Sequence, residues 1–178
     1  MRQIYLTGFM GCGKSTVSRA LAKCLNRRRV EMDESLERQA GKPISKIFEE
    51  EGEGTFRRLE SELLRRVAAG PPAVVSCGGG VVLRQENVDV MQDSGVVILL
   101  TASPHTIYDR VKNSTHRPLL NGRMNPRAIA RLMEERRPSY EAAAGLVIET
   151  DEKTVEEIVT EIVAKFAGET GRQRCERP

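Results

Sequence analysis

The chain has 178 residues, of which 39% are hydrophobic and 30% charged, as is typical of one soluble globular domain. It has no tryptophan and only 4% aromatic residues, so it lacks stacking platforms for single-stranded nucleic acid, and its net charge of +3 comes without a basic stripe. These features argue against nucleic acid and suit small anionic ligands.

Short apolar runs alternate with helical patterns, which predicts an α/β fold, a three-layer sandwich around a five-stranded parallel sheet. The predicted strands span residues 2–7, 29–32, 73–77, 96–100 and 146–150. The run Arg27-Arg28-Arg29, between a helical pattern and a strand, is interpreted as a solvated loop.

Several helices carry clear signals. One follows the first strand over residues 14–26, and an apolar stripe from Phe56 to Val67 marks another. Ser103-Pro104 predicts a capped helix start, and Thr154 with Glu157 forms a capping box before a last amphipathic helix. We predict a single domain over 1–167, an insertion at about 33–61, a lid at about 112–124, and a frayed or disordered tail over 168–178.

The chain has no membrane-length apolar stretch, and its start does not resemble a signal peptide. Its cysteines show neither a C-x-x-C pair nor zinc-type spacing, which indicates free thiols; they are Cys12, Cys24, Cys77 and Cys175. We therefore expect a cytoplasmic protein without a membrane partner. Since no apolar stripe suggests an interface, monomer is the default.

The strongest motif follows the first strand: Gly8-Phe9-Met10-Gly11-Cys12-Gly13-Lys14-Ser15 matches the phosphate-binding P-loop, G-x-x-x-x-G-K-[ST]. Glycines let the backbone N–H groups curl around phosphate oxygens, Lys14 reaches the β- and γ-phosphates, and Ser15 ligates Mg²⁺. The motif predicts ATP and Mg²⁺ as cofactors, with nucleotide contacts from Gly11, Cys12, Gly13, Lys14, Ser15 and Thr16. Cys12 is interpreted as a small filler.

Other motifs occur in a fixed order along the chain, and together with the P-loop they resemble shikimate kinase. They are Asp33-Glu34-Ser35-Leu36-Glu37, Gly41, Ile44, Ile47-Phe48, Gly52-Glu53, Phe56-Arg57, Glu60, Gly78-Gly79-Gly80, His116-Arg117-Pro118-Leu119-Leu120 and Arg136-Arg137-Pro138-Ser139-Tyr140. The resemblance implies a P-loop kinase fold and an enzyme that phosphorylates the 3-hydroxyl of shikimate with ATP, in aromatic amino acid biosynthesis.

The same resemblance implies roles for single residues. Asp33 would hold the reacting hydroxyl, although it could equally cap a helix, and Arg57 and Arg136 would bind the substrate carboxylate as bidentate partners. Gly78, Gly79 and Gly80 would let the backbone approach the substrate; a flexible turn is the alternative. The implied catalytic residues are Lys14, Asp33 and Arg117.

Further roles follow for the nucleotide side. Arg117, in the lid, would offset charge on the transferred phosphoryl group, and Arg110 would pack on adenine unless it is a surface helix arginine. The metal would be held by Ser15 and Glu31, with Ser76 near its water shell. Glu31 departs from the family, which has aspartate there, and is one methylene longer. His105 and His116 have no partner spacing.

Two rival functions remain at this point. A kinase for another small hydroxy-acid, such as gluconate, would keep the phosphate loop and one carboxylate-binding arginine. A nucleotide-binding protein that has lost catalysis would belong to a different class, and Glu31 is the only hint of it.

Overall fold

The computed structural model describes residues 2–112 and 125–175, and side chains up to Phe166. The elements follow in the order β1 Gln3–Thr7, α1 Lys14–Cys24, β2 Arg28–Glu31, α2 Met32–Ala40, α3 Ile44–Ala68, β3 Ala73–Ser76, the 3-10 turn Val81–Leu83, α4 Gln85–Ser94, β4 Gly95–Thr101, α5 Pro104–Val111, α6 Pro126–Ala143, β5 Leu146–Glu149 and α7 Val155–Cys175.

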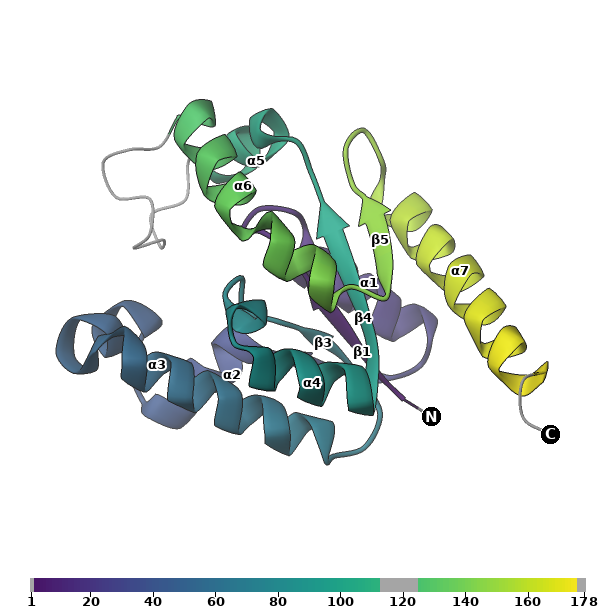
Figure 1. Ribbon diagram of the computed structural model, residues 1–178, viewed down its shortest axis with the longest axis horizontal. Helices are drawn as coiled ribbons and strands as arrows, with labels where there is room; N and C mark the ends of the chain where they lie inside the picture. The colour runs from purple at the N-terminus through teal and green to yellow at the C-terminus, as the bar shows by residue number, and fades with distance from the viewer. Residues whose placement is uncertain (1, 113–124, 176–178) are drawn as a thin grey trace.

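One parallel sheet has the strand order β2-β3-β1-β4-β5. Every residue of β1 and β3 is buried, because helices cover both faces of these strands. Helices α1 and α7 pack together on one side of the sheet, and α4 and α6 contact β4 from the other (Figure 1). The predicted three-layer α/β sandwich with five parallel strands is confirmed.

The chain crosses over on different sides of β1, so the sheet has a switch point at its centre. In open α/β sheets, ligands bind beyond the carboxyl ends of the strands at such a point. The loop that follows β1, from Gly8 to Gly13, therefore lies at the most favourable place in the fold for a ligand.

The predicted strands agree with the structure to within one residue at each end, but the first arginines of β2 correct one interpretation. Arg28 and Arg29 belong to the strand, and Arg29 is only partly exposed, so the arginine run is not a solvated loop. The preceding helix α1 ends at Cys24, two residues before its predicted end, because Asn26 takes a positive φ of 48° that no helix continues.

The helix caps were predicted correctly. The Ser103 side chain accepts a hydrogen bond from the Thr106 amide, and Thr154 and Glu157 make the reciprocal bonds of a capping box. Helix α7 continues to Cys175, past residue 168 where the tail was predicted to begin; once nucleated, a helix adds residues at little cost. Among the described residues, no helix is both long and apolar enough to cross a membrane.

Two consecutive helices, α2 and α3, replace a simple crossover between β2 and β3, as the sequence predicted for this stretch. Helix α3 bends at Gly52, which has a φ of 81° and interrupts the helical backbone. Beyond this bend α3 carries Arg57 and Glu60 on its buried side. Helices α2 and α3 thus lie beside the β2 and β3 end of the sheet (Figure 1).

Candidate active site

The loop between β1 and α1 has the backbone of a phosphate cradle. Gly8, Gly11 and Gly13 all have positive φ values, and at Gly8 a Cβ atom would lie 2.3 Å from the Leu100 carbonyl oxygen. Gly13 precedes α1 in a left-handed conformation, and no side chain caps the helix. The first amides of α1 therefore point toward the loop without a side-chain acceptor, which favours an anion there.

Lys14 folds back over this loop. Its Nζ donates hydrogen bonds to the carbonyl oxygens of Gly8 (2.8 Å) and Phe9 (2.9 Å) and lies 3.8 Å from the Cys12 sulfur. The lysine charge is thus held at the loop where phosphate oxygens would sit. Cys12 is fully buried, which agrees with its interpretation as a filler.

Glu31 and Ser76 lie side by side at the carboxyl ends of β2 and β3, where they form a register pair. The Ser76 hydroxyl is buried and has no hydrogen-bond partner within the described part of the chain. Glu31 is 8% exposed and forms a 2.6 Å ion pair with Arg29. Sequence reasoning gave Arg29 no role, although its position two residues before Glu31 places both on one face of the strand.

These oxygens suit Mg²⁺, which prefers hard ligands and usually takes one or two carboxylates besides phosphates and water. The Ser76 hydroxyl, which has no partner within the described part of the chain, would hydrogen-bond a water molecule of the metal. Ser15 supplies a second hydroxyl from the first turn of α1. Among the described residues, no cluster of three or more His, Cys, Asp or Glu could hold a metal by itself. The residues fit a metal that arrives with a nucleotide.

Asp33 faces the glycine run from α2. A Cβ atom on Gly78 would lie 3.0 Å from Asp33 Oδ1 and 2.6 Å from Glu60 Oε1, so both carboxylates crowd against this backbone. The interpretation of Asp33 as a helix cap is wrong, since α2 begins at Met32 and Asp33 is its second residue. The short strand β2 passes directly into α2, and this places the Asp33 carboxylate near the carboxyl ends of the strands.

Arg57 is buried, with 8% of the residue exposed. It donates to Glu60 at 2.8 Å and to Glu53 at 3.1 and 3.2 Å. A Cβ atom on Gly80 would lie 2.3 Å from Arg57 Nη1, so the guanidinium lies directly against the glycine. Arg57 is therefore not a solvated surface arginine.

The Arg57–Glu60 pair perturbs the titration of both groups. Burial raises the pKa of the Glu60 carboxyl above its usual range, against the attraction of Arg57, and the nearby Asp33 raises it further. Burial lowers the pKa of Arg57, but the carboxylates of Glu60 and Glu53 together outweigh this and hold it above the ordinary value. One carboxylate oxygen of Glu60 has no hydrogen-bond partner within the described chain and lies beside Gly78.

Tyr140 ties the glycine run to α6. Its buried hydroxyl donates to the Gly79 carbonyl oxygen and also hydrogen-bonds Arg136, which lies four residues earlier on the same helix face. Burial raises the pKa of Tyr140 to about 12. Arg136 is half-buried, and its interaction with Tyr140 places it one residue away from the glycine run. Sequence reasoning named Tyr140 only within a motif; its position one turn after Arg136 was the available signal.

Arg110 bridges the phosphate loop and the start of the β5–α7 connection. It is exposed, and it donates to the Gly11 carbonyl oxygen at 3.3 Å and to both oxygens of Thr150 at 3.2 Å. Two of the other predicted residues, Arg117 and His116, lie outside the described residues. His105 is exposed, and its Nδ1 lies 3.1 Å from a carboxylate oxygen of Asp109, one turn along α5.

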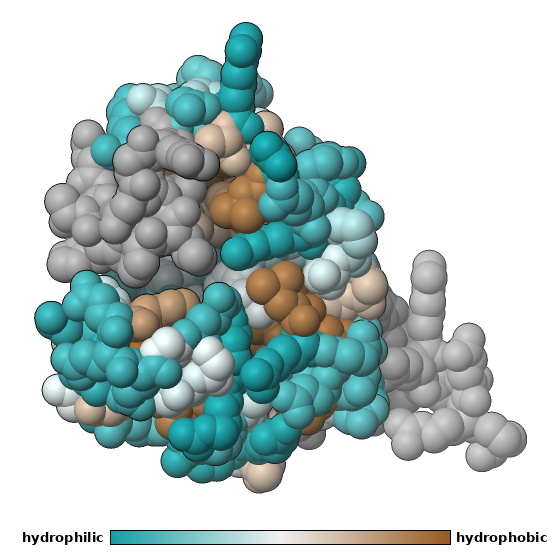
Figure 2. Space-filling view, turned by 60° about the vertical axis from the view of Figure 1, so that its left-hand side comes forward, coloured by the Kyte–Doolittle hydropathy of each residue, from teal (hydrophilic) through white to brown (hydrophobic). Residues whose placement is uncertain are grey.

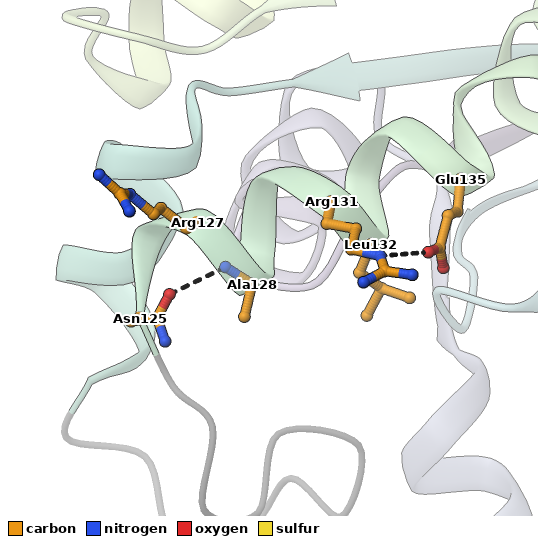
Figure 3. Close-up of a pocket in the computed structure, with 6 residues that line it drawn as sticks. All are labelled: Asn125, Arg127, Ala128, Arg131, Leu132 and Glu135. Carbon is orange, nitrogen blue, oxygen red and sulfur yellow. Dashed lines mark hydrogen bonds and ion pairs between the residues drawn. The ribbon is translucent and has the colours of Figure 1, made fainter.

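The face shown in Figure 2 is mostly hydrophilic, with hydrophobic residues in hollows near its centre. A pocket of about 560 Å³ lies along α6, lined by Asn125, Arg127, Ala128, Arg131, Leu132 and Glu135 (Figure 3). It contains none of the predicted site residues, and its Asn125 and Arg131 side chains bond to α6 itself. The site chemistry therefore lies elsewhere, at the carboxyl edge of the sheet.

Comparison with known proteins agrees with this arrangement. The model of the shikimate kinase family matches residues 10–167. A shikimate kinase of Symbiobacterium thermophilum is 42% identical over 172 residues, covering 94% of this chain and 99% of that protein. One from Geobacter sulfurreducens is 44% identical over 161 residues, covering 90% of this chain and 88% of the other.

Solved structures agree as well. A shikimate kinase from Acinetobacter baumannii in complex with shikimate superposes with a TM-score of 0.90 at 31% identity, covering 95% of this chain and 94% of the other. A gluconokinase from Sinorhizobium meliloti covers 99% and 98% with a TM-score of 0.66 but is only 19% identical, which shows a common fold alone. The phosphate loop, the glycine run and the extent of these matches show that the chain belongs to the shikimate kinase family.

Proposed function

We propose that the chain transfers the γ-phosphoryl group of ATP to the 3-hydroxyl of shikimate, giving ADP and shikimate 3-phosphate for aromatic amino acid biosynthesis. The observation that carries the proposal is the juxtaposition of two sets of residues around Gly78–Gly80. Asp33 and Arg57 crowd against these glycines from the insertion, and a Cβ atom on Gly79 would lie 3.8 Å from the Gly8 carbonyl oxygen of the phosphate loop.

On the donor side, ATP binds with its phosphates in the loop from Gly8 to Gly13, against the N-terminus of α1. Lys14 exchanges its two carbonyl contacts for phosphate oxygens and stabilises the charge on the transferred group. A Mg²⁺ ion bound with the nucleotide would supply positive charge that offsets the charge of the phosphates. Ser15 and Glu31 would hold it, with the Ser76 hydroxyl bonding to a metal-bound water.

On the acceptor side, the substrate carboxylate binds to Arg57 and Arg136, since guanidinium groups can take two oxygens at once. Glu60 and Glu53 hold the Arg57 guanidinium in position before the substrate arrives. Asp33 accepts the hydrogen bond of the reacting hydroxyl, orients its oxygen toward the γ-phosphorus and takes its proton.

Other expectations complete the proposal. Arg117 covers the transferred phosphoryl group from the lid at about 112–124, which excludes water from the site. Arg110 lies at the adenine side of the loop through its bond to Gly11. We further propose that residues 1–167 form a single domain, and that the protein acts as a monomer in the cytoplasm.

A coupled assay of ADP release over a panel of hydroxy-acids tests the proposal. Shikimate should support turnover, and Asp33→Ala and Arg136→Ala variants should lose it while still binding ADP. Turnover of gluconate without turnover of shikimate would overturn the assignment of the acceptor. ADP binding without turnover of any acid would show a nucleotide-binding protein without catalysis.

A further inference from the structure

A chain of hydrogen bonds joins the two predicted metal-holding residues, and it passes through Arg29. The Arg29 side chain donates through Nη2 to Glu31 Oε2 at 2.6 Å and through Nε to the Ser18 hydroxyl at 3.0 Å. The Ser18 hydroxyl in turn donates to the Ser15 carbonyl oxygen at 3.0 Å. One guanidinium therefore connects the end of β2 to the first turn of α1.

We propose that Arg29 is a positioning residue for the metal site, holding Glu31 and Ser15 at a fixed separation for a nucleotide-bound Mg²⁺. The inference deepens the proposed function and depends on it. Arg29 is suited to the task because its planar fork presents Nε and Nη2 in fixed directions, so it can hold a carboxylate and a hydroxyl at the same time.

Burial makes the positioning effective. Glu31 is 8% exposed, the Arg29 side chain 21%, and Ser18 is fully buried. A glutamate has one more rotatable bond than the aspartate expected at this place, and an unrestrained side chain would spread over several rotamers. The ion pair to Oε2 selects one of them and, among the hydrogen bonds of the described residues, leaves Oε1 open. Arg29 thus compensates for the extra methylene of Glu31.

The Arg29–Glu31 pair borders a hollow at the edge of the sheet, which has a volume of about 530 Å³ and lies beside β2. Partners of metal-holding side chains commonly contribute 10- to 100-fold to metal affinity or activity, because they fix the orientation of the groups that bind.

The sign of the effect separates positioning from simple charge. Arg29 is a cation close to a proposed cation site, so charge repulsion alone would make Mg²⁺ bind more tightly after its removal. Positioning predicts the reverse. The two effects can therefore be told apart by the direction in which a neutral substitution moves Mg²⁺-dependent nucleotide binding.

The test measures the dissociation constant of ADP by calorimetry, in MgCl2 and in EDTA. The dissociation constant in EDTA divided by that in MgCl2 gives the factor by which Mg²⁺ strengthens ADP binding. In Arg29→Gln we expect the ratio to fall about tenfold, with the constant in EDTA little changed. Arg28→Gln is the matched control: Arg28 is the preceding residue of β2, so its side chain leaves the strand on the opposite face, and among the described residues it hydrogen-bonds the Pro71 carbonyl oxygen and not Glu31 or Ser18.

A double variant decides whether Arg29 acts through Glu31. Arg29→Gln in a Glu31→Gln background should change the ratio little beyond Glu31→Gln alone, because partners in one network are not additive. An unchanged or increased ratio in Arg29→Gln would overturn the proposal. So would a weakening that is equal in EDTA and in MgCl2, which would indicate a structural role only.

The result does not depend on which acid is phosphorylated, since ADP binding needs no acceptor. If shikimate fails as a substrate but the ratio falls as expected, the acceptor assignment is wrong and the role of Arg29 stands. If Mg²⁺ does not strengthen ADP binding to the unmodified chain, the metal part of the proposed function is overturned, and this inference with it.

Discussion

Replacing Gly80 by alanine tests the proposed carboxylate site with a single methyl group. Gly80 has a φ of −107°, which alanine adopts without backbone strain, so the substitution acts only through space. The new Cβ would lie 2.3 Å from Arg57 Nη1, whereas ordinary contacts begin at 3.4 Å. The guanidinium must therefore retreat by about 1 Å or more, and its 2.8 Å bond to Glu60 cannot stretch that far.

The cost follows from the hydrogen bonds that Arg57 loses. One hydrogen bond to a charged group contributes about 1.5–3 kcal/mol, and each 1.36 kcal/mol is a factor of ten. We expect the KM for shikimate to rise about 10- to 100-fold in Gly80→Ala, with little change in the KM for ATP. Steady-state kinetics with each substrate varied in turn measures both values.

The neighbouring glycine supplies a graded comparison. Among the described residues, a Cβ atom on Gly79 would meet nothing closer than the Tyr140 hydroxyl at 3.7 Å, so Gly79→Ala should raise the KM for shikimate far less. The reasoning is refuted if the two variants have the same KM for shikimate, or if Gly80→Ala weakens ATP as much as shikimate.

Three further variants test other parts of the account. Lys14→Met should lower kcat about 100-fold or more in the coupled assay, because it removes a cation from the transferred phosphoryl group; near-normal turnover would exclude that role. Asp33→Asn should lower kcat by about 10² to 10⁴ with a smaller effect on the KM for shikimate, and a change in KM alone would contradict its role as a base. Tyr140→Phe should lose about 1 kcal/mol of unfolding free energy in urea. Folding raises the Tyr140 pKa from 10.0 to about 12, so the stability that Tyr140 contributes is present below pH 10 and lost between pH 10 and 12. Over this range the free energy of unfolding should fall less steeply with pH in the Phe variant than in the unmodified chain. Equal slopes would refute the linkage.

Local patterns predicted the sheet and the capped helix starts well. Five apolar runs gave all five strands, since β-rich runs between helical patterns have few other interpretations. Helices α4 and α6 were not singled out. Helix α6 begins with Asn125-Pro126, a cap residue followed by proline like Ser103-Pro104 at the start of α5. Pro138 in the interior of α6 obscures the helical pattern.

The contacts within the site were beyond local patterns. Motif spacing identified Asp33, Arg57 and Gly80, but the burial of Arg57 against Gly80 depends on how α3 bends and packs. The partnership of Arg29 with Ser18 depends on the packing of α1 against β2, which no local pattern encodes. An arginine in a run of three looks solvated in sequence, and only tertiary structure shows which one is held.

In the proposed reaction the phosphoryl group goes to the 3-hydroxyl of shikimate. The most direct measurement is phosphorus NMR of the product formed from ATP, Mg²⁺, shikimate and the full chain. The account predicts one phosphate monoester whose phosphorus couples to the proton on carbon 3. Coupling to the proton on another carbon, or release of inorganic phosphate without a phosphate ester, would contradict it.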